Sequence, residues 1–356
     1  MNVCILGVGL TSLTLAKALV NLGINVDVYS KKGVHIKKDN RTLGISKSNI
    51  DFINENIVDI KKLQWKIKKI EIYSDALNKE RILNFENSNE QLFSVLKNHE
   101  LISNIFLELK KNKLFKLKKM DINKDLFDKD YNLIINSDSS NFISKKFFYK
   151  RILKEYKSYA YTSVIRHKEI NNNIAIQIFT NNGPLAFLPI SESETSVVFS
   201  KRGYDKIDFD QVIKKYNLKY KISKIGKTLS FELKSTNLRS YFYKNILAFG
   251  DLLHQIHPLA GQGFNMSIRD IKVLTDLIKF RVSNGLELDS SICREFEKKM
   301  KHKNFLFSNG IDFIYEIFNI ESKINKDIIS KSAKALGKNK YINNFFTKVA
   351  DTGIII

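Results

Sequence analysis

The first thirty residues constrain the fold more than any other part of this chain of 356 residues. Asn2–Leu6 is a short apolar run typical of a buried strand, and a glycine-containing turn follows at 7–12. Leu13–Leu22 then has the composition of a helix closed by Gly23, and Ile24–Tyr29 is a second apolar run. This order of strand, glycine turn, helix and strand predicts a parallel sheet that begins with a dinucleotide-binding βαβ unit.

The residues of this first turn suit a pyrophosphate. Gly7 permits a tight turn, and Gly9 lets the backbone approach a pyrophosphate whose charge would lie at the helix N-terminus. Ser12 stands where the dinucleotide fingerprint has its third glycine. At the end of the second strand, Ser30 replaces the acid that usually binds the ribose, and its hydroxyl can hydrogen-bond without charge assistance. A glycine turn of another α/β protein is the alternative interpretation.

A second segment, Ile246–Asp270, follows the same logic. Its first four residues are apolar and predict a buried strand, which Gly250 and Asp251 follow directly. A loop with one proline and two glycines then leads into a helix. A strand that delivers a carboxylate to its C-terminal end, beside the N–H groups of a helix start, predicts a nucleotide-cofactor site.

The residues of this second segment resemble the second FAD signature of flavin-dependent aromatic hydroxylases. The matching positions are Gly250-Asp251, His254, His257-Pro258 and Gly261-Gln262-Gly263. Among these hydroxylases the closest resemblance is to those of ubiquinone biosynthesis, relatives of p-hydroxybenzoate hydroxylase. Gly183–Pro189 narrows the family most, because it resembles their Gly-Pro-Leu-Ala-x-Leu-Pro run, although by itself it indicates only a proline-flanked buried strand.

The resemblance implies a set of FAD contacts. Arg41 matches an arginine that contacts the FAD pyrophosphate, with an exposed loop arginine as the alternative. Asp251 would hold the ribityl chain, and Pro258 would lie beside the ring. The N–H groups of residues 261–265 would stabilise negative charge on the reduced flavin. The other implied cofactor-binding residues are Gly7, Gly9, Ser12, Ser30, Asn98, Asp138, Gly261, Gln262, Gly263, Phe264 and Asn265.

No side chain is predicted to perform the chemistry itself, because in such enzymes the flavin supplies the reactive species. The catalytic residue is therefore unknown from the sequence, with Pro258 nearest the ring and His257 as a weak candidate. His254 is expected to stabilise its loop rather than to act in catalysis. Two histidines three positions apart, without a third ligand, do not indicate a metal site.

The implied activity is that of an FAD-dependent NAD(P)H aromatic-ring monooxygenase. It would use NADPH as a transient co-substrate, and O2, to hydroxylate a polyprenylated phenol in ubiquinone biosynthesis. Two alternatives stay open: a hydroxylase of a soluble aromatic compound, and a non-hydroxylating flavoprotein scaffold bound to other ubiquinone-biosynthesis proteins. The scaffold alternative has support from Ser12, Ser30 and Ser139, which stand at signature positions; Ser139 replaces the glycine of an Asp-Gly pair.

The expected fold class is α/β, with a Rossmann-like FAD-binding domain, an interleaved and mainly antiparallel substrate domain, and C-terminal helices. The expected boundaries are 1–60, 86–140 and 241–290 for the FAD-binding domain, 61–85 and 141–240 for the substrate domain, and 291–356 for the helices. Periodicity further predicts a hairpin over 65–85, a helix over 91–111, strands at 114–117 and 131–136, and a four-stranded meander over 160–201.

The net charge of +22 comes almost entirely from lysine, with 9 Arg against 50 Lys. Because no nucleic-acid-binding motif accompanies it, we expect no nucleic-acid partner. No apolar run approaches the roughly 20 residues of a spanning helix, and Met1–Leu10 leads into a strand rather than a signal peptide. We therefore expect a cytoplasmic protein with reduced cysteines.

Near the C-terminus, apolar residues recur at helical spacing beside the basic stretch Lys298–Lys303; they are Phe307, Ile311, Ile314 and Phe318. These residues predict either helices packed on the flavin domain or a peripheral surface at the inner membrane that admits a polyprenyl tail.

Overall fold

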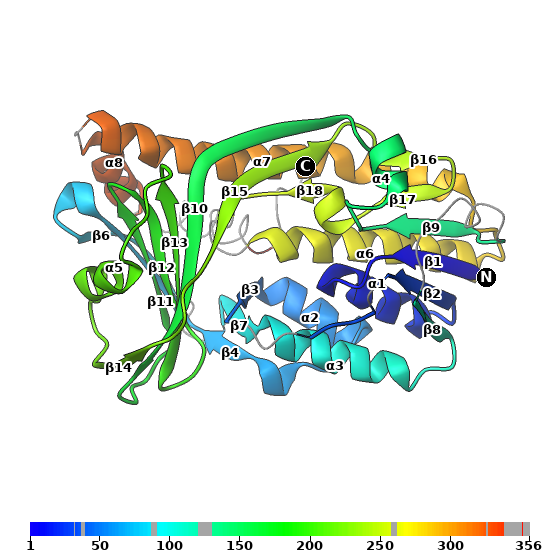
Figure 1. Cartoon of the computed structure of the whole chain (residues 1–356), viewed down its shortest axis with the longest axis horizontal. Coiled ribbons are helices and arrows are strands. Elements are labelled where there is room, and N and C mark those ends of the chain that lie inside the picture. Colours follow the sequence, from blue (N-terminus) through cyan, green and yellow to red (C-terminus); the bar gives the residue numbers. More distant parts are fainter. Residues whose placement is uncertain are drawn as a thin grey trace.

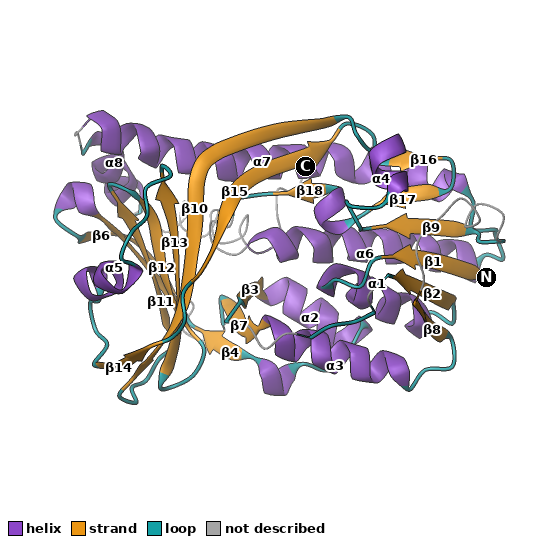
Figure 2. Ribbon diagram, viewed as in Figure 1, coloured by secondary structure: helices purple, strands orange, loops and turns teal. Residues whose placement is uncertain are grey.

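The computed structural model describes residues 1–31, 33–36, 40–86, 91–119, 130–257, 262–324, 327–337 and 351. Figure 1 shows a parallel sheet at one end of an elongated molecule and a larger sheet at the other, with the helix α7 (Ser290–Ile324) running along both. Figure 2 shows that the helices α1 (Leu10–Asn21), α3 (Asn98–Lys110) and α6 (Gln262–Ser283) gather at the parallel-sheet end. The α/β fold class predicted from the sequence is confirmed.

The six-stranded sheet contains both segments singled out in the sequence. Its order is β16 (Phe242–Tyr243), β17 (Ile246–Ala248), β9 (Leu133–Asn136), β1 (Asn2–Leu6), β2 (Asn25–Ser30) and β8 (Phe115–Lys119). All neighbours are parallel except β16 and β17. The sheet is doubly wound about β1, whose apolar residues are fully buried, and α1 packs against β1, β2, α3 and α6.

The nine-stranded sheet is mainly antiparallel. Along its main path the order is β18 (His254–Gln255), β15 (Leu229–Leu238), β10 (Arg151–His167), β13 (Glu194–Arg202), β12 (Gly183–Pro189), β11 (Ile174–Thr180), β5 (Lys69–Ser74) and β6 (Glu80–Glu86). A further strand, β14 (Ile222–Ile225), pairs with β10, and β5 is parallel to β11. The helix α5 (Phe209–Tyr216) covers one face with apolar side chains. The predicted hairpin is confirmed as β5 and β6. The predicted four-stranded meander is confirmed only for β11, β12 and β13, because β10 pairs with β13 rather than with β11.

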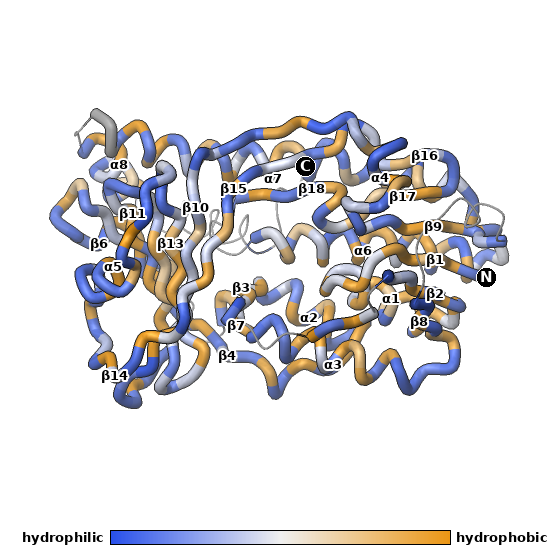
Figure 3. The backbone as a smooth tube through the Cα atoms, viewed as in Figure 1, coloured by the Kyte–Doolittle hydropathy of each residue, from blue (hydrophilic) through white to orange (hydrophobic). Residues whose placement is uncertain are grey.

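A small third sheet corrects one prediction. Its strands are β3 (Thr42–Ser46), β7 (Phe93–Lys97) and β4 (Trp65–Ile67), and α2 (Lys47–Asn56) follows β3. The helix predicted over 91–111 is wrong in its first third, because β7 precedes α3 there. Phe93 and Val95 favour an extended backbone, and pairing with two neighbouring strands fixes it. Figure 3 shows polar and apolar residues interspersed along α3, the part of the segment where the predicted helix is observed.

The C-terminal helices join the two ends of the molecule. The first half of α7 contributes Ile292, Phe296 and Met300 to the core of the parallel-sheet domain. In its second half Phe307 and Ile311 are buried, as predicted. The next buried residue of the stripe is Tyr315, and Ile314 is exposed. The predicted stripe is therefore wrong at Ile314. The chain then forms α8 (Ile328–Leu336), which packs on β6. No helix among the described residues is long and apolar enough to span a bilayer.

Candidate functional site

Three parallel strands end side by side at one edge of the six-stranded sheet. The N–H of Ser137, after β9, donates to Leu6 O at the end of β1 (3.0 Å), and Phe249 N, after β17, donates to Asn136 O (2.8 Å). These bonds bring the turn that starts at Gly7 next to the segment that starts at Gly250. The two signature segments, separated by more than two hundred residues of sequence, therefore meet at the carboxyl edge where doubly wound folds bind ligands. We call this place the cofactor edge.

Both meeting points require glycine. Gly7 has a φ of 111°, and a Cβ there would lie 2.6 Å from Ser137 Oγ. Gly250 has a φ of 58°, and a Cβ there would lie 3.1 Å from Thr11 Cγ2 in the first turn of α1. A side chain would combine backbone strain with a steric clash at Gly7, and with tighter than usual packing against Thr11 at Gly250. The glycines thus allow the two signature segments to pack against each other.

The N-terminus of α1 is open toward the cofactor edge. Gly9 occupies the N-cap position of α1 and offers no side-chain cap to this helix. In contrast, the side chains of Asn141 and Asp208 cap the helices that follow them. Among the described residues, no atom lies within 4 Å of a Cβ placed at Gly9. The first turns of α1 and α6 contain no acidic residue. Helix starts of this kind accept an anion through their backbone N–H groups and dipole.

Asp251 and Arg41 face the same region. Asp251 is accessible to solvent, yet surrounding protein raises the pKa of its carboxyl by burial, while the nearby charges of His254 and Arg41 act in the opposite direction. Arg41 precedes β3, and its carbonyl accepts a hydrogen bond from Asn98 N (3.0 Å), because β3 pairs with β7. Arg41, Asn98 and Asp251 are thus brought together from three distant parts of the sequence.

His254 is fixed by a buried acid. Its Nε2 donates to Asp270 Oδ2 in α6 (2.5 Å), and both side chains are fully buried. Asn304 Nδ2 of α7 donates to the other carboxylate oxygen (3.0 Å). Although burial lowers the pKa of His254, the Asp270 carboxylate outweighs it, and the net pKa is raised. This arrangement supports the expected loop-stabilising role of His254.

His257 has a contrasting environment. It is fully buried, lies edge-on to Tyr156 (centroids 4.9 Å apart) and packs at a tilt on Tyr315 (4.3 Å). Burial and the positive charges of Arg202 and Lys154 lower its pKa to about 3, so the imidazole is neutral. The following residues 258–261, which include the predicted contacts Pro258 and Gly261, lie outside the described residues.

Several other predicted contacts already use their side chains within the protein. Ser12 Oγ lies 2.5 Å from Ser137 Oγ, and Ser30 Oγ accepts from Gly33 N (3.1 Å). Asp138 Oδ1 accepts from Ser140 N (2.8 Å). Asn265 donates to Gly44 O (2.7 Å) and accepts from Ser46 N (2.9 Å). These residues could offer a ligand their backbone groups. Gln262, Gly263 and Phe264 form the first turn of α6 with Asn265.

Two acids escaped the sequence analysis. Asp270 lies between the buried residues Ile268 and Ile271 of α6, so a charge on a buried face was the available signal, but its partner could not be inferred. Asp351 Oδ1 accepts from Ser48 N in the first turn of α2 (2.9 Å), and its carbonyl accepts from Arg269 Nη2 (3.3 Å). No sequence pattern indicates that contact.

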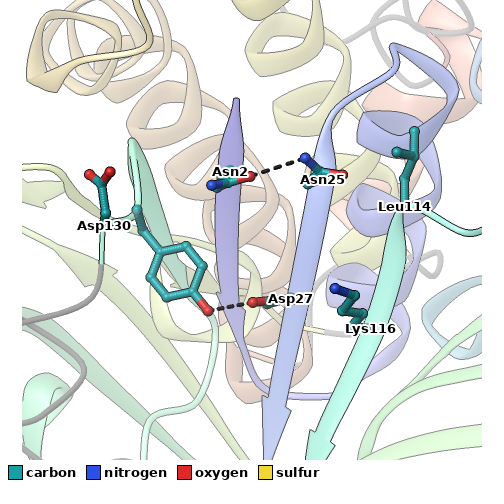
Figure 4. A pocket seen from close by; sticks show the side chains of 7 residues that line it. Asn2, Asn25, Asp27, Leu114, Lys116 and Asp130 are labelled. Atoms are coloured by element: carbon teal, nitrogen blue, oxygen red, sulfur yellow. Dashed lines mark hydrogen bonds between the residues drawn. The ribbon is translucent and has the colours of Figure 1, made fainter.

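A pocket of ≈ 330 Å³ lies at the amino end of the parallel strands, opposite the cofactor edge. Figure 4 shows Asn2 and Asn25 joined at the starts of β1 and β2. The hydroxyl of Tyr131 donates to Asp27 Oδ2. Lys118 Nζ also bonds Asp27 (2.5 Å). Because it lies at the opposite end of the strands, this pocket does not belong to the cofactor edge.

Comparisons with known proteins agree with this geometry, although no family model matches the chain. The chain is 28% identical over 156 residues to 3-demethoxyubiquinol 3-hydroxylase of Escherichia coli (strain K12), a match covering 40% of this chain and 39% of that protein. It is 21% identical over 275 residues to the mitochondrial ubiquinone biosynthesis monooxygenase COQ6 of Schizosaccharomyces pombe (strain 972), covering 62% and 57%. The predicted resemblance to the ubiquinone-biosynthesis hydroxylases is confirmed. The matches span only 39% and 57% of the lengths of these two relatives.

Solved structures support the fold over nearly the whole chain. The p-nitrophenol 4-monooxygenase PnpA of Pseudomonas putida superposes with a TM-score of 0.79 at 10% identity, covering 99% of this chain and 98% of that one. Klebsiella pneumoniae HpxO, solved with FAD and uric acid, gives 0.70 at 14% identity and covers 99% and 97%. The chain has the fold of the aromatic-ring monooxygenases.

Proposed function

We propose that the chain is an FAD-dependent monooxygenase that hydroxylates the aromatic ring of a polyprenylated phenol in ubiquinone biosynthesis, with NAD(P)H and O2 as co-substrates. The observation that carries this proposal is the meeting of the Gly7 turn with Gly250-Asp251 at the cofactor edge. The names of the sequence relatives support the substrate class.

The residues at the cofactor edge fit FAD. The open N-terminus of α1 and the guanidinium of Arg41 would bind the pyrophosphate, and Asp251 would accept hydrogen bonds from ribityl hydroxyls. The first turn of α6 would face the negatively charged edge of the reduced ring, an interaction of about 0.3 to 2 kcal/mol. When bound, FAD would supply the redox chemistry by which, with electrons from NAD(P)H, one oxygen atom of O2 enters the phenol ring and the other leaves as water.

The protein's own contribution is binding, orientation and the exclusion of water. β18 connects the proposed FAD site with the nine-stranded sheet. It follows Asp251 in sequence, and its His254 pairs with Asn237 of β15. We therefore assign 1–60, 86–140 and 241–290 to FAD binding, and 61–85 and 141–240 to the substrate domain, with 291–356 as C-terminal helices. The neutral His257, packed between aromatic rings, keeps the boundary between them apolar.

The same proposal includes the location of the protein in the cell. A polyprenylated substrate partitions into lipid, so the chain would work in the cytoplasm while in peripheral contact with the inner membrane. The net charge of +22 favours approach to an anionic surface.

Substrate turnover tests the proposal. We expect the purified protein to oxidise NADPH faster with a prenylated phenol than with its unprenylated counterpart, and to form a product heavier by one oxygen atom. Equal rates with both phenols would indicate a hydroxylase of soluble aromatics. If NADPH oxidation is absent with both phenols and other ubiquinone-biosynthesis proteins co-purify with the chain, the result would indicate the scaffold function. Ser12, Ser30 and Ser139, which stand at signature positions, support that alternative.

A further inference from the structure

A groove of ≈ 820 Å³ lies between the first half of α7 and the adjoining ends of β10 and β15. Its lining includes Ile152 of β10, Leu238 of β15 and Phe305 of α7. The walls are tied together, because Ile152 pairs with Asn237, whose Nδ2 donates to Ser308 Oγ of α7 (3.0 Å). The groove is therefore a preformed feature of the surface.

Basic side chains surround this groove. Arg239, Arg294, Lys298 and Lys301 all line it, and all are exposed. The acidic lining residue Glu297 is already paired with Lys301 (Nζ to Oε1, 2.7 Å). Farther along α7, Asp312 and Glu316 are paired with Lys154 of β10 (3.6 and 3.2 Å). The groove thus carries an excess of positive charge.

Large apolar side chains lie exposed beside these charges. Ile152 and Phe305 are each 45% exposed, and farther along α7 Phe313 and Ile320 are 65% and 49% exposed. At 3.6 residues per turn, Lys298, Phe305, Phe313 and Ile320 project from one side of the helix. Exposed apolar side chains grouped beside basic ones are the composition of a surface that lies at a lipid interface.

We propose that this groove and the adjoining exposed side of α7 form the face by which the protein docks on an anionic phospholipid membrane. The basic side chains would lie among the headgroups, and Ile152, Phe305 and Phe313 would enter the acyl boundary. An acidic protein partner fits less well, because lysine is depleted from protein–protein interfaces. The proposal rests on the membrane contact proposed above and assigns the surface that makes it.

Vesicle flotation tests this assignment. The full chain should float with vesicles of equal parts phosphatidylglycerol and phosphatidylcholine, but not with phosphatidylcholine alone. The double variant Lys298→Ala/Lys301→Ala should partition roughly thirtyfold more weakly, since each basic residue near an anionic surface contributes about fivefold. The matched control is Lys61→Ala/Lys62→Ala in the turn after α2, on the side opposite α7 in Figure 1, which should remain within about twofold of the wild type. Phe305→Ser should also weaken partitioning.

The outcomes separate this inference from the proposed function. Flavin absorbance is recorded on each sample, because flavin binding does not depend on the α7 surface. Yellow protein that fails to float, or that floats equally well in both double variants, overturns the docking face and leaves the flavin proposal standing. Colourless protein that floats only with intact Lys298 and Lys301 supports the docking face and counts against the flavin proposal. If the wild type binds a polyglutamate resin but does not float with vesicles, the result would indicate an acidic protein partner. That result would also overturn the membrane-docking face.

Discussion

Two neighbouring parts of the segment that follows β17 are held by different forces. The cofactor edge, up to His254, is fixed by glycine-dependent backbone contacts and by the buried pair with Asp270. Three residues later, His257 lies in an aromatic cluster with Tyr156 and Tyr315. The first region holds a charge in the interior, whereas the second excludes charge. One short loop can therefore position an ionic cofactor on one side and keep an apolar boundary on the other.

Removal of the buried acid should have the largest effect. Asp270→Ala leaves His254 in the interior without its carboxylate, and breaking a buried ion pair costs about 3 to 5 kcal/mol. The free energy of unfolding in urea measures this loss. Asp276→Ala, which removes an exposed aspartate from the same helix, should change it by less than about 0.5 kcal/mol. Equal losses in the two variants would show that the pair does not hold the cofactor edge.

A glycine substitution tests the backbone contacts of the cofactor edge. Gly7→Ala should lower the free energy of unfolding by about 1 to 3 kcal/mol through backbone strain, and further through the contact of the new Cβ with Ser137. Gly23→Ala is the matched control, because it also has a positive φ but meets no described atom within 4 Å. If thermal unfolding shows the same loss for both variants, close packing against Ser137 does not distinguish Gly7.

The two histidines should give opposite pH dependences. The pKa of His257 is lowered to about 3, so its contribution to stability is lost as pH falls from the ordinary value of about 6.5 toward 3. The pKa of His254 is raised, so its contribution is complete below about 6.5 and is lost as pH rises through the higher folded-state value.

The variant His257→Phe tests the pH dependence assigned to His257. Of the variants described other than the controls, it should change the free energy of unfolding least at neutral pH. A near-isosteric ring should change the free energy of unfolding by less than about 1.5 kcal/mol. Below pH 6.5, however, the variant should lose stability less steeply than the wild type, by up to about 1.4 kcal/mol per pH unit. Urea titrations across pH measure both slopes. Parallel curves for the two proteins would mean that His257 is not held neutral by burial.

The sequence was informative where local pattern decides the structure. Apolar runs bounded by glycine located β1, β2 and β17, and the Gly7 and Gly250 motifs indicated their common ligand. Tertiary pairing decided the rest. Residues 93–97 became β7 because two strands flank them, and no local pattern could pair β5 in parallel with β11. The buried stripe of α7 passes through Tyr315 because of its contact with Tyr156.

The side-chain contacts of the site were less predictable than its location. Asp270 is paired across sixteen residues and Asp351 across more than three hundred, and each pairing depends on how helices dock. The Ser30 hydroxyl, expected to hydrogen-bond a ribose, accepts from Gly33 N, and Ser12 Oγ lies beside Ser137 Oγ. Motif spacing identifies which strand ends meet, whereas the orientation of each side chain depends on neighbours that only the fold supplies.

The visible absorption spectrum of the purified protein reports whether the Gly7 turn and Gly250-Asp251 bind a flavin. If the Gly7 turn and Gly250-Asp251 close on one flavin, the wild type should show bound FAD after purification or after incubation with it. Asp251→Ala should lose the flavin while keeping a cooperative unfolding transition, and Asp276→Ala should retain it. A folded wild-type protein that stays colourless after incubation with FAD would contradict the account.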